Sequence, residues 1–423
     1  MHVMILGSGL LGTATAWFLS DSGHDVTVVD RQPGSGLETS FANGGQISVS
    51  HAEPWANPHA PAQLLKWLGK EDAPLLFRWR LDPALWGWGL RFLGECRPSR
   101  TRDNIAQLVN LGVYSRATLQ TLRRELGLEY DQLECGILHF FTRDDSLAAG
   151  IDAAAAMREY GCDSQPVSAA RCLEIEPALR HSTIAIVGGT YTPSDESGNA
   201  YRFTSALAEH CRLRGVRFLY ETHIDRIVVE GEKLSGVQVR DAAGVSRVER
   251  ADAYVMACGS YSPLLLKPAG VSIPVYPAKG YSITVPVLPD GDAPRVSLTD
   301  DEEKLVFSRL GPELRVAGTA EFNGYNVEIN QARCEAIVRR VAALFPAAGD
   351  YGSARYWTGL RPATPGNVPL IGRTRYPNLY LNTGHGTLGW THSCGSGRAL
   401  ADIIGGKRPE VDFRFLGIDR PAP

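Results

Sequence analysis

Residues 1–30 read MHVMILGSGLLGTATAWFLSDSGHDVTVVD, and this stretch decides the fold. A short apolar run at residues 3–6 leads into Gly7-Ser8-Gly9-Leu10-Leu11-Gly12, and residues 13–20 then place apolar side chains at helical spacing. Gly23 stands where that helix would end, and residues 26–30 are typical of a second strand. A strand, a glycine-rich turn, a helix and a strand in this order form a unit that binds a dinucleotide.

The glycines of this unit each have a physical role. Gly7 permits the tight turn, Gly9 lets the backbone approach a pyrophosphate, and Gly12 allows helix and strand to pack closely. The phosphates would lie at the helix N-terminus, where free N–H groups and the helix dipole favour an anion. Asp30 is expected to accept hydrogen bonds from ribose hydroxyls, and Arg31 to lie near the adenine or the phosphates. The candidate dinucleotide-binding residues of this unit are Val3, Leu6, Gly7, Ser8, Gly9, Leu10, Leu11, Gly12, Asp30 and Arg31.

The rest of the chain bears on which dinucleotide is bound. The motif itself does not distinguish FAD from NAD, and Asp30 disfavours only NADP. No second GxGxxG follows, but residues 383–390, TGHGTLGW, form another glycine cluster between an expected strand and an expected helix. A flavin is long enough to be held at both ends, and a helix N-terminus beside its ring would stabilise the charge that builds on reduction. The alternative is that this cluster merely starts a helix.

Composition excludes several classes of function. The 423 residues predict two or three folding units, and 43 Lys+Arg against 46 Asp+Glu give a net charge of −3, without the basic surplus typical of nucleic-acid binding. The glycine motif begins too early for a cleavable signal peptide, and no apolar run predicts a transmembrane helix. The eight cysteines lack CxxC spacing, so we expect free thiols in a cytoplasmic protein and no metal. No nucleophile-elbow pattern supports a hydrolase.

The expected elements alternate along the chain without a linker, which indicates interleaved domains. Residues 61–160 are mostly helical in pattern, and the acidic residues 300–303 indicate a solvated turn. Helices are expected at 104–126, 148–160, 200–214, 331–344 and from about 390, and strands at 216–220, 224–229, 236–240, 253–257, within 271–330 and at 379–383.

Several longer segments together resemble the bacterial D-amino acid dehydrogenases of the small-subunit type, within the D-amino acid oxidase, glycine oxidase and sarcosine oxidase superfamily. They are VMILGSGLLGTATAWFL, ETSFANGGQIS, ADAYVMACGSYS, PVYPAKGYSIT, YWTGLRPATPG and LYLNTGHGTLGWTHSCGSG. The resemblance implies an α/β fold with α+β elements, in which a Rossmann-like FAD-binding domain is interleaved with a mixed-sheet substrate domain. It places the FAD-binding domain at residues 1–60, 175–262 and 355–423, and the substrate domain at 61–174 and 263–354.

The resemblance also implies a set of site residues around a non-covalently bound FAD. Arg361, in GLRP, would hold the substrate carboxylate, and Ile224 would contact the adenine. The further candidate FAD-binding residues are Thr39, Ser40, Asn43, Gly44, Gly45, Gln46, Gly259, Gly386, Thr387, Leu388, Gly389, Trp390 and Thr391.

Two further side chains are candidates for the catalytic neighbourhood. Lys279 and Tyr281 lie in YPAKGY, where they either border the substrate or flavin or occupy the outward face of a strand. The segment 48–51, SVSH, departs from the Pro-Gly-Tyr-like stretch expected of the family, and Gly366-Asn367 departs from an Asp-Gly. These departures bear on substrate preference and on a turn beside the site.

Five of the eight tryptophans lie between residues 55 and 88, with arginines among them. Aromatic rings beside guanidinium groups are typical of a membrane interface, so residues 55–102 predict a peripheral membrane contact, and the resemblance implies the inner face of the bacterial inner membrane. The alternative is that these rings fill a helical core or cover the active site. The tryptophans are Trp55, Trp67, Trp79, Trp86 and Trp88.

The resulting hypothesis is FAD-dependent oxidative deamination of D-amino acids. Hydride transfer from Cα–H to flavin N5 would yield a 2-oxo acid and ammonia, and the electrons would pass to a quinone-type acceptor. The alternatives are an oxygen-using oxidase of glycine or secondary amines on the same fold, a non-catalytic FAD-binding module, and an NAD-dependent dehydrogenase.

Overall fold

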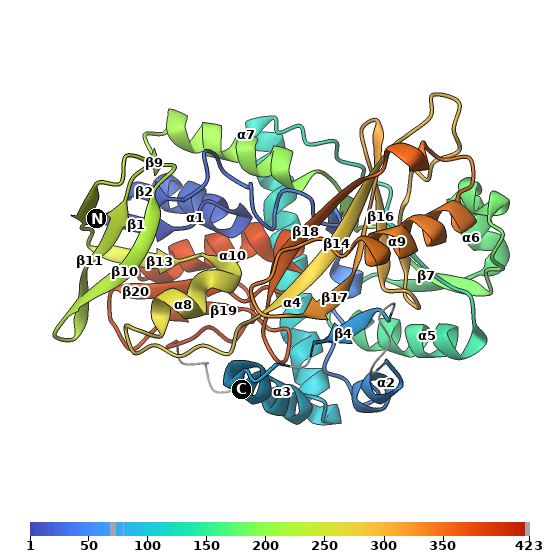
Figure 1. Cartoon of the computed structure of the whole chain (residues 1–423), viewed down its shortest axis with the longest axis horizontal. Coiled ribbons are helices and arrows are strands. Elements are labelled where there is room, and N and C mark those ends of the chain that lie inside the picture. The colour runs from blue at the N-terminus through green and yellow to red at the C-terminus, as the bar shows by residue number, and fades with distance from the viewer. Residues whose placement is uncertain (68–72, 79, 419–423) are drawn as a thin grey trace.

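Two large β-sheets lie side by side in the computed structural model, which describes residues 1–67, 73–78 and 80–418 (Figure 1). The first is six-stranded, and its neighbouring strands are parallel except for the last pair, which is antiparallel. Its order is β9 (Arg217–Leu219), β2 (Asp25–Val29), β1 (His2–Leu6), β13 (Ala253–Met256), β20 (Leu379–Thr383) and β19 (Leu370–Arg373).

Both faces of this sheet are covered, which explains the uninterrupted apolar run of β1. Val3 and Ile5 face helices α1 (Leu10–Asp21), α7 (Ala200–Leu213) and α10 (Gly389–Ile404). Met4 and Leu6 face the opposite layer. That layer consists of α8 (Ser262–Leu266) and a small sheet of β10 (His223–Glu230), β11 (Lys233–Arg240) and β12 (Ser246–Glu249).

The second large sheet is nine-stranded and mixed, because β15/β5 and β17/β4 are parallel pairs among antiparallel ones. Helices α9 (Gln331–Leu344) and α6 (Ala169–Ile175) pack against it. Its path is β18 (Arg355–Ala363), β14 (Tyr276–Pro286), β17 (Glu313–Phe322), β16 (Leu305–Leu310), β15 (Ser297–Asp300), β5 (Ile137–Phe141), β7 (Gly188–Thr192) and β6 (Gln165–Ser168), with β4 (Leu75–Phe77) beside β17.

The remaining elements connect and flank the sheets. The long helix α4 (Pro98–Leu126) packs against α10, so it belongs to the core of the first sheet. Among the described residues, no helix combines the length and apolarity needed to cross a membrane. The other elements are α2 (Ala60–Trp67), α3 (Pro83–Glu95), α5 (Asp144–Arg158), the strand pair β3 (Gln46–Ile47) and β8 (Glu196–Ser197), and the 3₁₀ turns η1 (Val49–His51), η2 (Pro177–His181), η3 (Gly259–Tyr261) and η4 (Tyr351–Ser353).

The predicted fold class is confirmed: a doubly covered parallel sheet stands beside a mixed sheet. The helical interpretation of residues 61–160 missed β4 and β5. β4 has only three residues and β5 is buried along its whole length, so neither shows a period of two. The predicted domain boundaries stay a prediction. However, β7 and β18, which lie in segments assigned to the FAD-binding domain, are strands of the nine-stranded sheet.

Candidate active site

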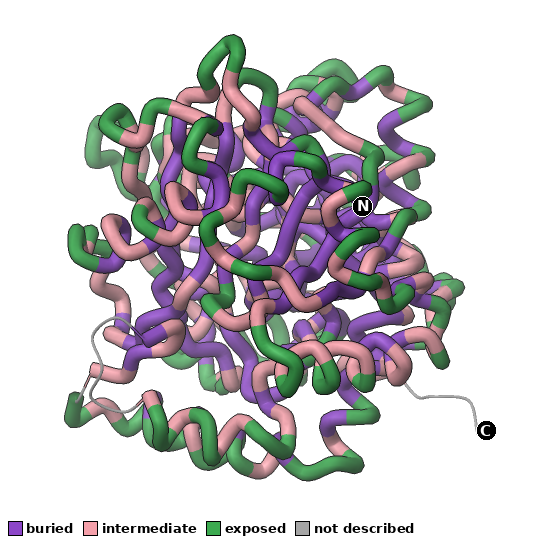
Figure 2. Tube along the Cα trace, turned by 90° about the vertical axis from the view of Figure 1, so that its right-hand side faces the viewer, coloured by how far each residue is buried: buried purple, intermediate pink, exposed green. Residues whose placement is uncertain are grey.

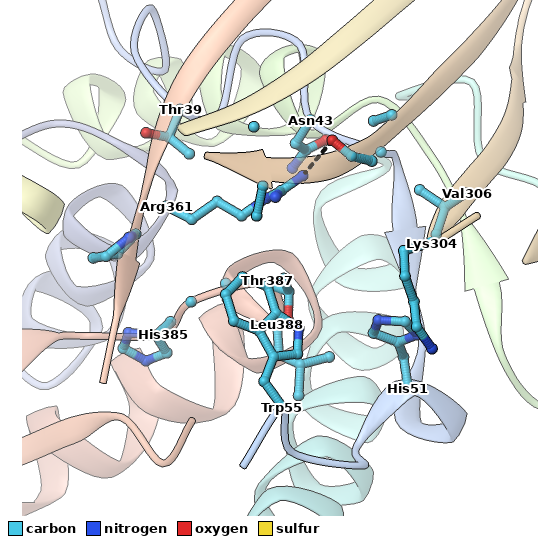
Figure 3. Close-up of a pocket in the computed structure, with 18 of the residues that line it drawn as sticks. Thr39, Asn43, His51, Trp55, Lys304, Val306, Arg361, His385, Thr387 and Leu388 are labelled. Carbon is cyan, nitrogen blue, oxygen red and sulfur yellow. Dashed lines mark hydrogen bonds between the residues drawn. The ribbon is translucent and has the colours of Figure 1, made fainter. Parts of the chain in front are cut away.

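A cavity of about 1710 Å³ runs between the two sheets, from the first glycine turn to the nine-stranded sheet and out to α2 and α5. Pockets for drug-sized ligands usually measure about 300–1,000 Å³, so this one is large enough for a dinucleotide and a second, small ligand. Figure 3 shows the part of the cavity where the first turn of α10 faces the nine-stranded sheet.

The glycine turn forms one end of the cavity. Gly7 has φ +106°, and its N–H donates to the Val29 carbonyl at 2.8 Å. A Cβ on Gly12 would lie 1.9 Å from the Gly7 carbonyl oxygen, so α1 could not pack here with a larger residue. A Cβ on Gly9 would meet only the Ser40 hydroxyl, at 3.8 Å. The backbone at Gly9 is therefore open to a ligand at the start of α1.

Asp30 and Arg31 continue this end of the cavity. Asp30 accepts hydrogen bonds from the Ser8 N–H at 2.6 Å and from the Gln32 N–H at 2.8 Å. Burial raises the pKa of Asp30, while these hydrogen bonds oppose the rise. The Arg31 guanidinium stacks 4.2 Å from the centre of the Tyr261 ring. The turn thus has a carboxylate and an aromatic–cation pair where ribose and adenine were expected.

The other end of the cavity is the start of α10. Gly384 and Gly386 have φ +80° and +52°, and the Gly386 N–H donates to the Pro362 carbonyl at 3.0 Å. The helix begins at Gly389 without a side-chain cap, so the N–H groups of its first turn point toward the cavity. Two helix N-termini, of α1 and α10, therefore border one elongated space.

Six of the predicted FAD-binding residues, from Thr39 to Gln46, belong to one segment that also lines the cavity. Thr39 donates to the Leu360 carbonyl at 2.9 Å, and the Ser40 hydroxyl accepts from the Leu10 N–H at 3.2 Å. The Gln46 amide donates to the Ser297 hydroxyl at 3.0 Å. These bonds attach the segment to α1 and to the nine-stranded sheet and place it along the cavity.

The structure brings most of the predicted site residues to the cavity wall and leaves five away from it. Val3, Leu6, Ser8, Gly12 and Lys279 are outside the lining. Those that line it are Gly7, Gly9, Leu10, Leu11, Asp30, Arg31, Thr39, Ser40, Asn43, Gly44, Gly45, Gln46, Ile224, Gly259, Tyr281, Arg361, Gly386, Thr387, Leu388, Gly389, Trp390 and Thr391.

Arg361, on β18, brings a half-buried positive charge to the middle of the cavity. Its Nη1 donates to the Thr319 carbonyl at 2.7 Å and its Nη2 to the Gly318 carbonyl at 3.3 Å. Within the described part of the chain, no carboxylate pairs with it. Burial lowers the pKa of Arg361 to about 10, so the group stays charged at neutral pH. A Cβ on Gly280 would lie 2.5 Å from Cζ, so this glycine makes room for the guanidinium.

Lys279 and Tyr281 point away from Arg361, because side chains alternate along β14. Lys279 Nζ lies 3.3 Å from a Glu321 carboxylate oxygen and donates to Asn326 at 3.0 Å. Tyr281 borders the cavity, but its hydroxyl donates to Glu321. Both side chains complete a buried polar cluster behind the strand, so their predicted catalytic role has no support in this geometry.

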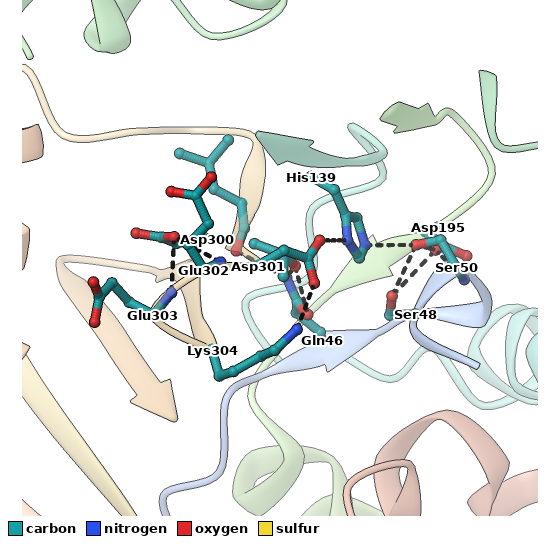
Figure 4. A network of polar contacts seen from close by, with 12 residues as sticks. Gln46, Ser48, Ser50, His139, Asp195, Asp300, Asp301, Glu302, Glu303 and Lys304 are labelled. Carbon is teal, nitrogen blue, oxygen red and sulfur yellow. Dashed lines mark hydrogen bonds and ion pairs between the residues drawn. The ribbon is translucent and has the colours of Figure 1, made fainter. Parts of the chain in front are cut away.

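The acidic turn at residues 300–303 is not the solvated turn that the sequence predicted. Asp300 is fully buried and pairs with Arg340 at 2.7 Å. The Asp301 carboxylate meets His139 Nδ1 at 2.8 Å and Lys304 Nζ at 3.5 Å (Figure 4). Although burial opposes it, these two neighbours hold the pKa of Asp301 below its usual range. The turn thus places the charged side chains of Asp301 and Lys304 on the cavity wall.

Sequence reasoning missed the residues around this turn. His51, His139 and Lys304 all line the cavity, yet they come from η1, β5 and the turn before β16. His51 lies in the segment singled out only as a departure from the family pattern. His139 and Asp301 are 162 positions apart, so no local motif could have linked them.

Comparisons with known proteins agree with this geometry. A family model described as FAD dependent oxidoreductase matches residues 2–403. The chain is 60% identical to a D-amino acid dehydrogenase of Dechloromonas aromatica, over 98% of this chain and 100% of that one. It is 51% identical to a D-amino acid dehydrogenase of Paramagnetospirillum magneticum, over 99% of each chain.

Solved structures show the same fold. An L-proline dehydrogenase from P. horikoshii matches with a TM-score of 0.75 at 15% identity, over 97% of this chain and 95% of that one. A glycine oxidase from Geobacillus kaustophilus matches with a TM-score of 0.74 at 21% identity, over 97% and 96%.

Replacing Gly9 by valine is expected to abolish dinucleotide retention without unfolding the protein. Gly9 has φ −65°, which valine adopts readily, and its side chain would project into the cavity where the pyrophosphate approaches. We expect the flavin absorbance per protein to fall by at least about tenfold, equivalent to 1.4 kcal/mol of binding, with an unchanged circular dichroism spectrum. Gly89→Val, in the open surroundings of α3, is the control and should keep its flavin.

Proposed function

The chain belongs to the family of FAD-dependent oxidoreductases, and we propose that it oxidises D-amino acids to 2-oxo acids and ammonia. The name D-amino acid dehydrogenase, carried by full-length relatives at 60% and 51% identity, supports this substrate class. The observation that carries the proposal is Arg361, a half-buried guanidinium in the cavity that is bonded to two carbonyl oxygens and pairs with no carboxylate among the described residues.

The cavity fits FAD as a non-covalent cofactor. An elongated space between two helix N-termini suits a molecule with a pyrophosphate in its middle and an electron-accepting ring at one end. We propose that Gly7, Gly9 and Asp30 hold the adenosine and pyrophosphate part. The backbone of residues 386–391 would hold the pyrimidine edge of the ring, where the dipole of α10 stabilises negative charge.

FAD supplies the two-electron acceptor when it is bound. The chain's contribution is to bind and orient the amino acid. Arg361 would hold the substrate carboxylate through two parallel N–H donors, a geometry that fixes the direction of Cα. With the amino acid held in this way, FAD would take up the hydride from the Cα–H bond, and water would hydrolyse the resulting imino acid to a 2-oxo acid and ammonia.

An anaerobic titration with D-alanine tests the function directly. We expect D-alanine to bleach the visible flavin absorbance of the purified protein, and L-alanine to leave it unchanged. A yellow protein that no amino acid reduces would be a non-catalytic FAD-binding module. Rapid peroxide formation in air would instead support the oxygen-using oxidase, with glycine, sarcosine and proline as the next substrates to test.

Replacing Arg361 by leucine should weaken substrate binding strongly. A hydrogen bond between charged groups contributes about 1.5–3 kcal/mol, so the loss of the paired donors should raise KM for D-alanine at least about tenfold to a hundredfold. Arg355→Leu is the matched control, because Arg355 lies on the same strand with its side chain 64% exposed. Flavin content reports whether both variants are folded. An unchanged KM in Arg361→Leu would contradict the assignment.

We propose that the electrons pass to a quinone-type acceptor and that α3 makes a peripheral membrane contact. Trp86, Leu90 and Leu93 project from one face of α3 and are 52%, 73% and 51% exposed. Exposed residues follow the lower edge of the molecule, where α2 and α3 lie (Figures 1 and 2). Arg91 and Arg97 are exposed nearby and would meet lipid phosphates.

The other tryptophans of this stretch have different environments. Trp88 is buried and donates to the Ala363 carbonyl at 2.9 Å, so it belongs to the core as the alternative predicted. Trp55 and Trp67 are half-buried and line the cavity. Trp79 lies outside the described residues. The membrane proposal therefore rests on the exposed face of α3 and not on the whole stretch.

Leu90→Glu should reduce sedimentation with vesicles of anionic phospholipid. A charge placed in the apolar face opposes its burial at the headgroup boundary, so the bound fraction should fall several-fold. Leu213→Glu is the control, since Leu213 is a comparably exposed leucine, 76%, on the distant helix α7. Equal loss in both variants, or none in either, would contradict a contact through α3.

A further inference from the structure

His51 is an imidazole of the cavity wall that has no hydrogen-bond partner among the described residues. It is the last residue of η1 and lines the same cavity as Arg361. Its ring makes no hydrogen bond within residues 1–67, 73–78 and 80–418. His51 and Arg361 enter the open space from opposite sides (Figure 3). One side of this space therefore presents the Arg361 guanidinium, and the other side presents the His51 imidazole, which has no hydrogen bond among the described residues.

The backbone that carries His51 is firmly anchored. Asp195, which is fully buried and paired with Arg116 at 2.8 Å, accepts from the N–H groups of Val49 and Ser50 at 3.0 Å each. The Ser50 hydroxyl contacts the Asp195 carboxylate at 2.7 Å. A buried, hydrogen-bonded ion pair of this kind fixes a short turn in one position.

A second set of contacts holds the neighbouring side chains. His139 is bonded at both ring nitrogens, through Nδ1 to Asp301 at 2.8 Å and through Nε2 to the Ser50 hydroxyl at 3.1 Å (Figure 4). The rings of His139 and His51 lie 6.0 Å apart. Both ring nitrogens of His139 thus have hydrogen-bond partners within the protein, whereas the neighbouring His51 ring has none among the described residues.

We propose that His51 binds the α-amino group of the substrate, accepting a hydrogen bond from it while Arg361 holds the carboxylate. This inference rests on the proposed function. An α-amino acid held by its carboxylate offers a hydrogen-bond donor close to the anchored end, and the facing wall must supply an acceptor. Asp195, Ser50 and the Asp301–His139 pair then act as positioning residues, since they fix η1 and the wall around the ring.

The charges around His51 keep its acceptor nitrogen available. Burial, followed by the charge of His139, lowers the pKa of His51 to about 4. Lys304 and Arg361 lower it further, whereas Asp301 opposes them. The imidazole is therefore uncharged above about pH 5, and one ring nitrogen has a free lone pair. A neutral acceptor also retains an ammonium less strongly than a carboxylate would, which favours the uncharged amine that can lose hydride.

The carboxylates of the same wall are less suited to this role. Asp301 already contacts His139 and Lys304. Glu53, which follows η1, is an exposed residue and accepts from the Asn57 amide at 3.1 Å. Asp301 and Glu53 thus have partners within the protein, which leaves the free imidazole as the better acceptor for the amine.

Two non-oxidisable ligands that differ only in the amino group test the proposal. 2-Amino-2-methylpropanoate lacks a Cα–H and cannot be oxidised. 2-Methylpropanoate carries a hydrogen in place of the amino group, so it has no amine to oxidise. Their dissociation constants are measured on the FAD-loaded protein from the shift of the flavin spectrum. The variants are His51→Leu, His51→Gln, which keeps an acceptor oxygen, and His59→Leu, which removes another cavity-lining imidazole as the control.

We expect His51→Leu to weaken the amino ligand about tenfold, the effect of one lost hydrogen bond, and to leave the deaminated ligand within about twofold. His51→Gln should restore most of the difference, and His59→Leu should show none. Equal weakening of both ligands would indicate a structural role and overturn the proposal, as would no weakening of either.

A contact between His51 and the substrate's side chain is the main competing role. In that case His51→Leu would raise KM for D-amino acids with polar side chains and leave D-alanine, which has only a methyl group, unchanged. The proposed function fails separately, if D-alanine does not reduce the wild-type flavin.

Discussion

The close approach of α1 to β1 is the constraint on which the rest of the site depends. A Cβ at Gly12 would lie 1.9 Å from the Gly7 carbonyl oxygen, and a Cβ at Gly7 would lie 2.7 Å from the Ala257 carbonyl oxygen. Only glycine lets the helix begin this close to the sheet, with its first N–H groups open to the cavity. α10 packs against α1, so the position of the second helix N-terminus follows from the first.

The nine-stranded sheet supplies a cation that faces the cavity, Arg361 on β18. Alternation along the paired strands β14 and β18 separates two cations, Lys279 and Arg361, that lie near each other across the strand pair. Arg361 lies over Gly280 on the cavity side, whereas Lys279 joins Glu321 behind the strand. A shift of one residue in register would exchange these roles, because it moves every side chain to the other face.

The sequence predicted the parts of the site that depend on neighbouring residues. Gly7, Gly9 and Gly12 belong to one turn, and Asp30 follows within a single strand–helix–strand unit, so spacing alone indicated them. Helices α7 and α9 were also predicted close to their observed bounds, because their apolar spacing is regular. The wall around His51 was not predictable in this way. It joins η1, β5 and the turn before β16, which only the pairing of distant strands brings together.

The structure of this wall also explains why the acidic residues 300–303 were predicted to form a solvated turn. Four successive acidic residues are usually solvated, because burying a carboxylate without a partner costs several kcal/mol. Here the partners come from elsewhere in the chain: Arg340 for Asp300, and His139 for Asp301. The same comparison of polar groups with their partners identifies the groups that a ligand could satisfy. Among the described residues, the Arg361 guanidinium donates only to carbonyl oxygens, and the His51 ring has no hydrogen bond. Incompletely satisfied polar groups destabilise a folded chain, and a bound amino acid would supply both missing partners at once.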